Sequence, residues 1–148
     1  MEEKGIQYFY RINSSVPSQI CIDAKLFGEI LFNIVKNAVQ FNKKDGSIFV
    51  TLSSDKKTKK LTVEVKDTGF GIDFFKQKRI YRNRIAALRE KNEMRPMFIG
   101  VGIGLTNSEI LCMHLGGNVT IQSQLNMGTI VTFSILYDTP PKIKGKNN

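Results

Sequence analysis

Three short polar motifs, about thirty residues apart, constrain the fold of this chain more than any other feature. The first is Asn33-Ile-Val-Lys-Asn37 in an amphipathic stretch, the second is Asp67-Thr-Gly-Phe-Gly71 after an alternating apolar stretch, and the third is Gly100-Val-Gly-Ile-Gly104. Each motif alone could be an ordinary turn or a solvated helix face. Their order and spacing predict one pocket, shared by two helices and a strand.

Residues 24–42 are predicted to form a helix that begins after Asp23, a residue type that often caps helix N-termini. At about 100° per residue, apolar and polar side chains separate onto opposite sides. The polar side carries Asn33, Asn37 and Gln40. The amide oxygen of asparagine can bind a hard cation such as Mg²⁺, although a solvated helix face explains these residues equally well in isolation.

Residues 48–53 and 61–65 alternate in polarity and predict a β-hairpin. Asp67 continues the apolar series of the second strand, so its carboxylate should point toward the apolar side of the sheet. A buried carboxylate without a partner costs several kcal/mol, so it requires a hydrogen-bond donor there. A bound base could supply that donor.

The glycines of residues 100–104 alternate at the start of a second predicted helix, residues 103–115, which should end at Gly116-Gly117. The segment lacks the Gly-Lys-Ser of a P-loop, and no strand-turn-helix unit precedes it as in a dinucleotide fingerprint. Unobstructed backbone N–H groups at a helix start favour a phosphate site. For this motif alone, a lid hinge without a ligand is the alternative.

The rest of the pattern predicts an edge strand over residues 7–13, a second hairpin of residues 119–123 and 130–135, and a flexible tail from residue 138. Residues 74–98 form a basic, partly helical insertion that is long for a passive connector, and such insertions beside a site are often lids. The 148 residues suit one domain, with its core over residues 23–136.

The composition, with 41% hydrophobic residues and no long apolar run, predicts a soluble domain without a membrane span. Cys21 and Cys112 lie in apolar stretches and are expected to be buried, reduced thiols, and His114 is expected to have no chemical role. The net charge of +9 gathers in residues 56–60 and 76–95. These segments suit a solvated face, a polyphosphate or a nucleic acid, but the last has only charge behind it and lacks an aromatic-basic platform.

With these motifs in place, the chain resembles the GHKL ATPase superfamily and, within it, the ATP-binding catalytic domain of a sensor histidine kinase. Residues 32–41 are similar to the family's N box, residues 65–72 to its G1 box and residues 100–105 to its G2 box. The resemblance runs from about Asp23 to Ile135. It implies an α/β (α+β) two-layer sandwich in which a mixed, mainly antiparallel sheet of about five strands packs against about three helices.

The resemblance also implies a role for individual residues. Asp67 would accept a hydrogen bond from the adenine amino group with support from Thr129, Phe41 would pack near the base, and Asn37 would hold Mg²⁺ beside Asn33. Gly102, Gly104 and Leu105 would meet the phosphates through backbone N–H groups, and residues 74–99 would be the ATP lid. The other positions assigned to the nucleotide are Gln40, Gly69, Gly71, Ile72, Gly100, Val101 and Ile103.

Three departures from the family pattern refine the expectation. Asn33 stands where hydrolytic members carry a glutamate that acts as general base, which predicts little activation of water. Gln40 replaces a Lys or Arg near the phosphates, which predicts lower nucleotide affinity. The lid has Ile80-Tyr81 in place of a Phe-x-Pro-Phe element, which weakens the predicted coupling to the phosphoacceptor.

The expected function is therefore that of a catalytic domain that binds Mg-ATP and transfers the γ-phosphoryl to a histidine on a separate dimerisation segment of the parent kinase. A response-regulator receiver is the expected downstream partner. The domain itself should be cytoplasmic and make no contact with a membrane. Its parent protein could be anchored in a membrane through another segment. A degenerate, non-catalytic nucleotide-binding or scaffold module of the same fold is the alternative.

Overall fold

The computed structural model describes residues 4–89 and 103–141 of the chain. The elements of this part follow in the order β1 (Gln7–Ile12), α1 (Ala24–Gln40), β2 (Ser47–Asp55), β3 (Lys60–Asp67), α2 (Phe74–Arg89), α3 (Ile103–His114), β4 (Val119–Gln124) and β5 (Gly128–Leu136). None of the described helices is both long enough and apolar enough to cross a lipid bilayer.

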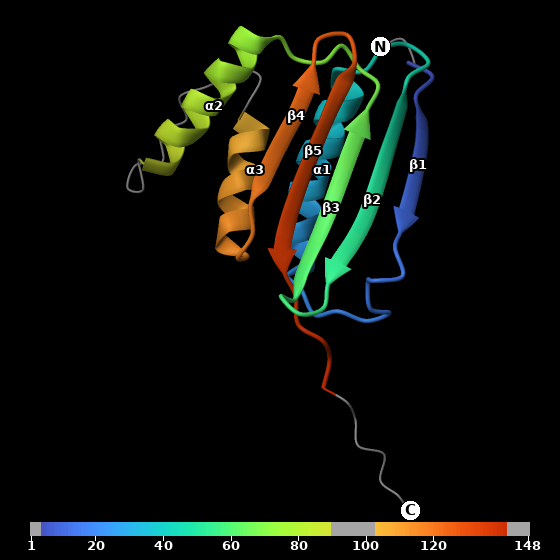
Figure 1. Cartoon of the computed structure of the whole chain (residues 1–148), viewed down its shortest axis with the longest axis vertical. Coiled ribbons are helices and arrows are strands. Elements are labelled where there is room, and N and C mark those ends of the chain that lie inside the picture. Colours follow the sequence, from blue (N-terminus) through green and yellow to red (C-terminus); the bar gives the residue numbers. More distant parts are fainter. Residues whose placement is uncertain (1–3, 90–102, 142–148) are drawn as a thin grey trace, which may run out of the picture.

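The strands form a single sheet in the order β1-β2-β3-β5-β4 (Figure 1). β1 runs parallel to β2, and the other neighbouring pairs are antiparallel. β5 therefore lies between β3 and β4, although it is the last strand in the sequence. The predicted edge strand and both predicted hairpins are confirmed.

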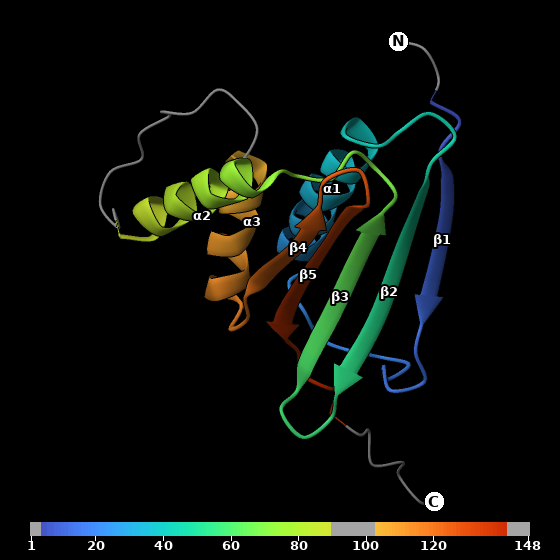
Figure 2. The same ribbon diagram turned by 45° about the horizontal axis from the view of Figure 1, so that its top comes forward.

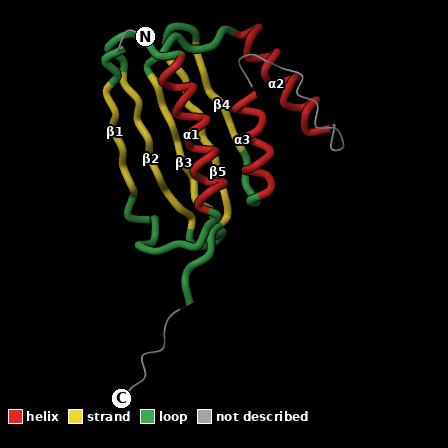
Figure 3. Tube along the Cα trace, turned by 180° about the vertical axis from the view of Figure 1, so that it is seen from behind, coloured by secondary structure: helices red, strands yellow, loops and turns green. Residues whose placement is uncertain are grey.

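Helices α1 and α3 lie side by side on one face of the sheet, as the view from behind shows (Figure 3). The other face carries no helix from the described part of the chain. Helix α2 packs against α3 and projects beyond the β4 edge (Figure 2). This arrangement confirms the expected two-layer sandwich with a mixed, mainly antiparallel sheet.

Helix α1 begins where Asp23 caps it, since the Asp23 side chain accepts a hydrogen bond from the Leu26 N–H at 3.0 Å. Its buried side packs on the sheet through Ile30, Ile34 and Ala38. The helix ends at Gln40, two residues earlier than predicted, because Phe41 leaves the helical conformation as its C-cap.

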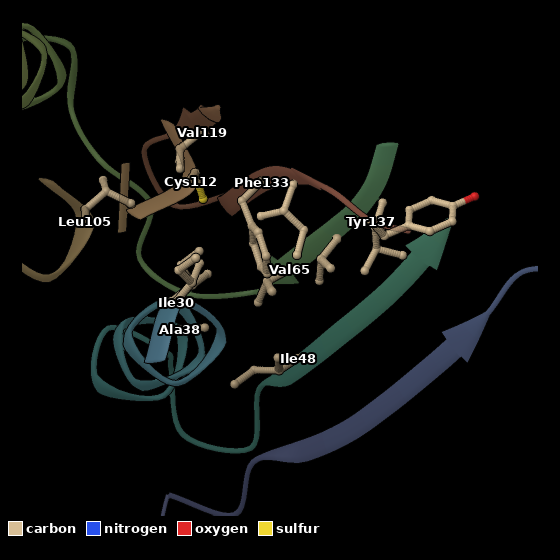
Figure 4. Packing of buried hydrophobic residues seen from close by; sticks show 13 residues of the cluster. Ile30, Ala38, Ile48, Val65, Leu105, Cys112, Val119, Phe133 and Tyr137 are labelled. Carbon is tan, nitrogen blue, oxygen red and sulfur yellow. The ribbon is translucent and has the colours of Figure 1, made fainter. Parts of the chain in front are cut away.

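The core lies between these helices and the central strands (Figure 4). Its buried members are Ile30, Ile34, Ala38, Ile48, Leu61, Val63, Val65, Leu105, Cys112, Val119, Phe133, Ile135 and Tyr137. A fully buried side chain of this size contributes about 1.5–3 kcal/mol, so the cluster is the main source of stability.

The two cysteines have different surroundings. Cys112 is buried as predicted, and burial together with the Glu109 carboxylate raises the pKa of its thiol to about 12. The prediction that Cys21 is buried is wrong, because Cys21 is exposed. Its backbone forms an isolated bridge with Asp138, which holds Cys21 at the rim of the fold. This bridge also fixes the backbone of Asp138, where the flexible tail was expected to begin.

Candidate functional site

Asp67 ends β3 with its side chain on the buried side of the sheet. The alternate residues that precede it in β3 are buried, and Asp67 itself is only 8% exposed. Its neighbours across the sheet are Ile48 of β2 and Thr129 of β5. The inward direction that the alternating pattern predicts is confirmed.

The hydrogen bonds that Asp67 accepts come from the backbone. Its Oδ1 accepts from the Gly69 N–H at 2.8 Å and from the Thr129 N–H at 3.2 Å. Burial raises the pKa of the carboxyl, and these two donors oppose that rise. The protein thus supplies part of the hydrogen bonding that a buried carboxylate requires. Both bonds end on Oδ1, so Oδ2 is the oxygen that the described residues leave for a ligand.

Two hydroxyl groups continue this row across the sheet, since Thr129 pairs with Asp67 and Ser123 pairs with Thr129. Thr129 Oγ1 is 2.8 Å from Ser123 Oγ, which also accepts a hydrogen bond from the Ile72 N–H at 2.9 Å. Ser123 was not among the predicted site residues. The predicted second hairpin already brings Ser123 close to Thr129, but the contact of Ser123 with Ile72 joins segments that are distant in sequence.

The loop after Asp67 passes over the end of α1. The Phe41 carbonyl accepts a hydrogen bond from the Phe70 N–H at 3.1 Å. A Cβ at Gly69 would collide with that carbonyl oxygen and lie 2.8 Å from Asp67 Oδ1, so only glycine allows this approach. The predicted site residues Phe41, Asp67 and Gly69 are therefore brought together.

Asn42 and Thr68 support this corner and were also missed. Asn42 is 1% exposed, and its Nδ2 donates to the Ser47 carbonyl at 3.2 Å. Its Oδ1 accepts from the Thr68 hydroxyl at 3.3 Å and from the Lys43 N–H at 3.0 Å. A polar residue just after a helix suggests a solvated cap, so the sequence gives no sign that Asn42 is buried.

The polar side of α1 faces the start of α3. Asn33 and Asn37 are half-buried, and a Cβ at Gly104 would lie 3.8 Å from the Asn33 side chain. The first and third motifs are therefore neighbours in space, as their pattern predicts. Asn33 and Asn37 lie on the polar side of α1, where a cation could bridge the helix to an anionic ligand at α3.

The third motif is only partly described. Gly100, Val101 and Gly102 lie outside the described residues, and Ile103 is the first residue of α3, as predicted. The Leu105 side chain is buried in the core, so only its backbone could meet a ligand. The Ser108 hydroxyl donates to the Gly104 carbonyl at 2.7 Å, which ties down the first turn of α3.

Gln40 is exposed at the end of α1, and an ammonium group lies beside it. Lys4 Nζ donates to the carbonyls of Gln40 at 2.6 Å, Asn42 at 3.3 Å and Val39 at 3.4 Å. A cation at a helix C-terminus interacts favourably with the helix dipole and so stabilises the helix. The sequence separation of Lys4 from α1 hides this contact from any local pattern.

Helix α2 covers the described part of the predicted lid, and residues 90–99 of that lid lie outside the described residues. Gln77 Nε2 donates to the carbonyls of Ile72 at 2.6 Å and Ser123 at 2.9 Å. Arg84 forms an ion pair with Glu109 of α3 and donates to the Val119 carbonyl at 2.9 Å. These polar contacts hold α2 beside the site.

Exposed aromatic side chains accompany the basic residues of α2. Phe74, Phe75 and Tyr81 are exposed there, and Lys78 Nζ lies 4.5 Å from the centre of the Phe74 ring. The hydrophobicity of these three rings suggests that they are buried. Helix α2 contacts the rest of the fold through few residues, however, so the rings face solvent.

Comparison with known proteins decides which family this geometry represents. A family model described as "Histidine kinase-, DNA gyrase B-, and HSP90-like ATPase" matches residues 22–139. The chain belongs to this family. The signal transduction histidine-protein kinase BarA of Escherichia coli K12 is 30% identical over 146 residues, which are 95% of this chain and 15% of BarA. The aerobic respiration control sensor protein ArcB of the same strain is 28% identical over 134 residues, which are 90% of this chain and 17% of ArcB.

Solved structures of histidine kinases share the fold of this ATPase family member. Full-length ShkA in complex with AMPPNP aligns with a TM-score of 0.71 and 27% identity, over 93% of this chain and 27% of ShkA. The catalytic domain of the histidine kinase ThkA, in a nucleotide-free form, aligns with a TM-score of 0.66 and 21% identity, over 90% of this chain and 79% of that chain. The resemblance to the catalytic domain of sensor histidine kinases is confirmed, and the chain spans a small part of its curated relatives' length.

Proposed function

We propose that this domain binds Mg-ATP and donates the γ-phosphoryl group to a histidine on a separate phosphoacceptor segment. The observation that carries the proposal is the Asp67 carboxylate, buried at the end of β3 and held by the Gly69 and Thr129 N–H groups. An acceptor at this position, open through Oδ2, suits the amino group of adenine. The nucleotide complex of ShkA supports the choice of ligand.

The other roles follow from what lies around Asp67. Phe41 would pack near the base, and Asn37 would hold Mg²⁺ beside Asn33 on the side of α1 that faces Gly104. Mg²⁺ when bound neutralises phosphate charge. The backbone N–H groups at the start of α3 would receive the phosphates. Because Asn33 is not a base, transfer would depend on positioning and on charge neutralisation rather than on activation of water.

Calorimetric titration with Mg-ATP tests the binding step. Asp67→Asn should weaken binding by about 1.5–3 kcal/mol, which is the range for a hydrogen bond to a charged group. Asp138→Asn is the matched control, because Asp138 is exposed and lies at the opposite end of the sheet. Equal affinity of the Asp67 variant and the wild type would contradict the assignment of the adenine acceptor.

A second assay tests transfer. The domain, a phosphoacceptor segment and labelled ATP should together yield phosphohistidine. Nucleotide binding without label on the histidine would favour the non-catalytic scaffold of the same fold. Steeply salt-dependent binding to DNA that ATP does not affect would instead favour a nucleic-acid function of the basic, aromatic α2.

A further inference from the structure

Strand β1 has an open backbone edge. It lies at one end of the sheet and pairs only with β2 among the described strands (Figure 1). The N–H groups of Gln7 and Asn13 donate to the Gly46 and Leu52 carbonyls, each at 2.9 Å. Because these groups alternate along a strand, Tyr8, Tyr10 and Ile12 direct their N–H and C=O groups away from the sheet.

This edge has little of the protection that exposed strands usually carry, because Arg11 is the one charged residue of β1. Strand β1 contains no proline and no lysine, and every residue in it is exposed, including Tyr10 at 83%. The opposite edge of the sheet differs, because the Val119 carbonyl of β4 accepts a hydrogen bond from Arg84. An exposed, largely apolar edge of this kind is suited to pairing with another strand.

We propose that β1 pairs in antiparallel orientation with β1 of a second copy of this chain, with the two-fold axis at Tyr10. The argument is that the strand is complementary to itself in this register. On the face that carries the helices, Tyr10 meets Tyr10 of the second copy, and Tyr8 meets Ile12. Aromatic and aliphatic side chains directly opposite each other stabilise antiparallel pairs.

The other face of the strand fits the same register. Phe9 lies on this face, where it stacks on Phe49 with ring centres 5.0 Å apart. In the antiparallel pair, Phe9 lies opposite Arg11 of the second copy, so a guanidinium packs against a ring. A parallel pair in register would instead place the two Arg11 side chains opposite each other. The single charge of the strand thus selects the antiparallel arrangement.

The backbone pattern agrees with this register. In an antiparallel ladder, alternate opposite residues exchange two hydrogen bonds, and Tyr8, Tyr10 and Ile12 are the residues that present outward groups. The net charge of +9 on each copy opposes association. Salt screens this repulsion, so the pair should strengthen as ionic strength rises, in contrast to a pair held by opposite charges.

Sedimentation equilibrium over a range of concentrations and salt tests the surface. The wild type should show a dimer whose population rises with salt, and Tyr8→Lys should abolish it. Tyr81→Lys is the matched control, because Tyr8 and Tyr81 are both 61% exposed and Tyr81 lies on α2. A wild type that stays monomeric throughout, or a dimer that survives Tyr8→Lys, would overturn the proposal.

Disulfide cross-linking in a Cys21→Ser background tests the register. Opposite residues that exchange hydrogen bonds have Cα atoms about 5.5 Å apart, which is within disulfide range, so Tyr10→Cys should cross-link two copies. Tyr8→Cys should not, because its counterpart is four residues along the strand, more than about 13 Å away. Cross-linking at Tyr8→Cys as fast as at Tyr10→Cys would contradict the two-fold axis. Circular dichroism verifies that both variants are folded.

Discussion

At the scale of single residues, Asp67 combines a structural cost with the binding function proposed for it. Burial raises the pKa of its carboxyl, and backbone donors offset only part of that rise. The folded state therefore holds the proton to a higher pH than the unfolded state does. Between the two pKa values the folded protein binds more protons, so the stability associated with this group is lost as pH rises.

This linkage predicts a pH-dependent difference between the wild type and Asp67→Asn. The free energy of unfolding of the wild type should fall relative to that of the variant as pH rises from the ordinary aspartate pKa through the raised value. Urea denaturation of both proteins across this window measures the difference, and other titrating groups contribute equally to both. Parallel stability curves would show that Asp67 has no raised pKa.

The site residues fall into two groups: those that a local sequence pattern predicts, and those whose contacts join distant parts of the sequence. Asp67 and Gly69 could be predicted because the period of one strand and one short motif place them. Ser123, Asn42 and Lys4 could not, since each acts on a residue that is distant in sequence or through unexpected burial. The error on Cys21 has the same origin: an apolar local sequence does not reveal that a backbone bridge holds the residue at the rim.

At the scale of elements, replacing a glycine by alanine should have opposite effects on stability at two positions, one after α3 and one within α1. Gly117 follows α3, where its N–H donates to the Cys112 carbonyl, and a Cβ there would collide with the Ser134 carbonyl. Gly117→Ala should destabilise the fold by about 2 kcal/mol or more. Gly28 lies within α1 with open space around it, so Gly28→Ala should stabilise the fold by about 0.5–1 kcal/mol. Thermal denaturation measures both, and shifts of the same sign would refute the argument.

The ion pair between Arg84 and Glu109 should control how firmly α2 is held. Glu109→Gln removes the charge but keeps the shape of the side chain. A hydrogen bond to a charged group contributes about 1.5–3 kcal/mol, so hydrogen exchange of the α2 amides should accelerate about tenfold or more. Arg79→Gln on the same helix is the control, because the Arg79 side chain is exposed. Unchanged exchange in Glu109→Gln would mean that other contacts hold α2.

At the scale of the whole molecule, a ligand that binds only the folded state must stabilise it. At 100 times its dissociation constant, a non-hydrolysable ATP analogue with Mg²⁺ should add about 2.7 kcal/mol to the free energy of unfolding. The midpoint of thermal denaturation should rise in the wild type and much less in Asp67→Asn. Chelation of Mg²⁺ should reduce the rise. An equal rise in both proteins would place the nucleotide elsewhere.

Both hairpins could be predicted from local periodicity, because each depends on neighbouring residues, whereas the two-layer class came from the family resemblance. The motifs, in turn, carried the resemblance to a family. The strand order could not be derived from periodicity, since the insertion of β5 between β3 and β4 depends on pairing between distant segments. The parallel pairing of β1 with β2 is hidden for the same reason.

The position of β5 has a consequence for how the protein is made. On the ribosome, β3 emerges with Asp67 before its partner Thr129 in β5 is made, so one side of β3 is unpaired in that interval. The nascent chain therefore lacks the hydrogen bond from Thr129 to Asp67 until β5 inserts between β3 and β4.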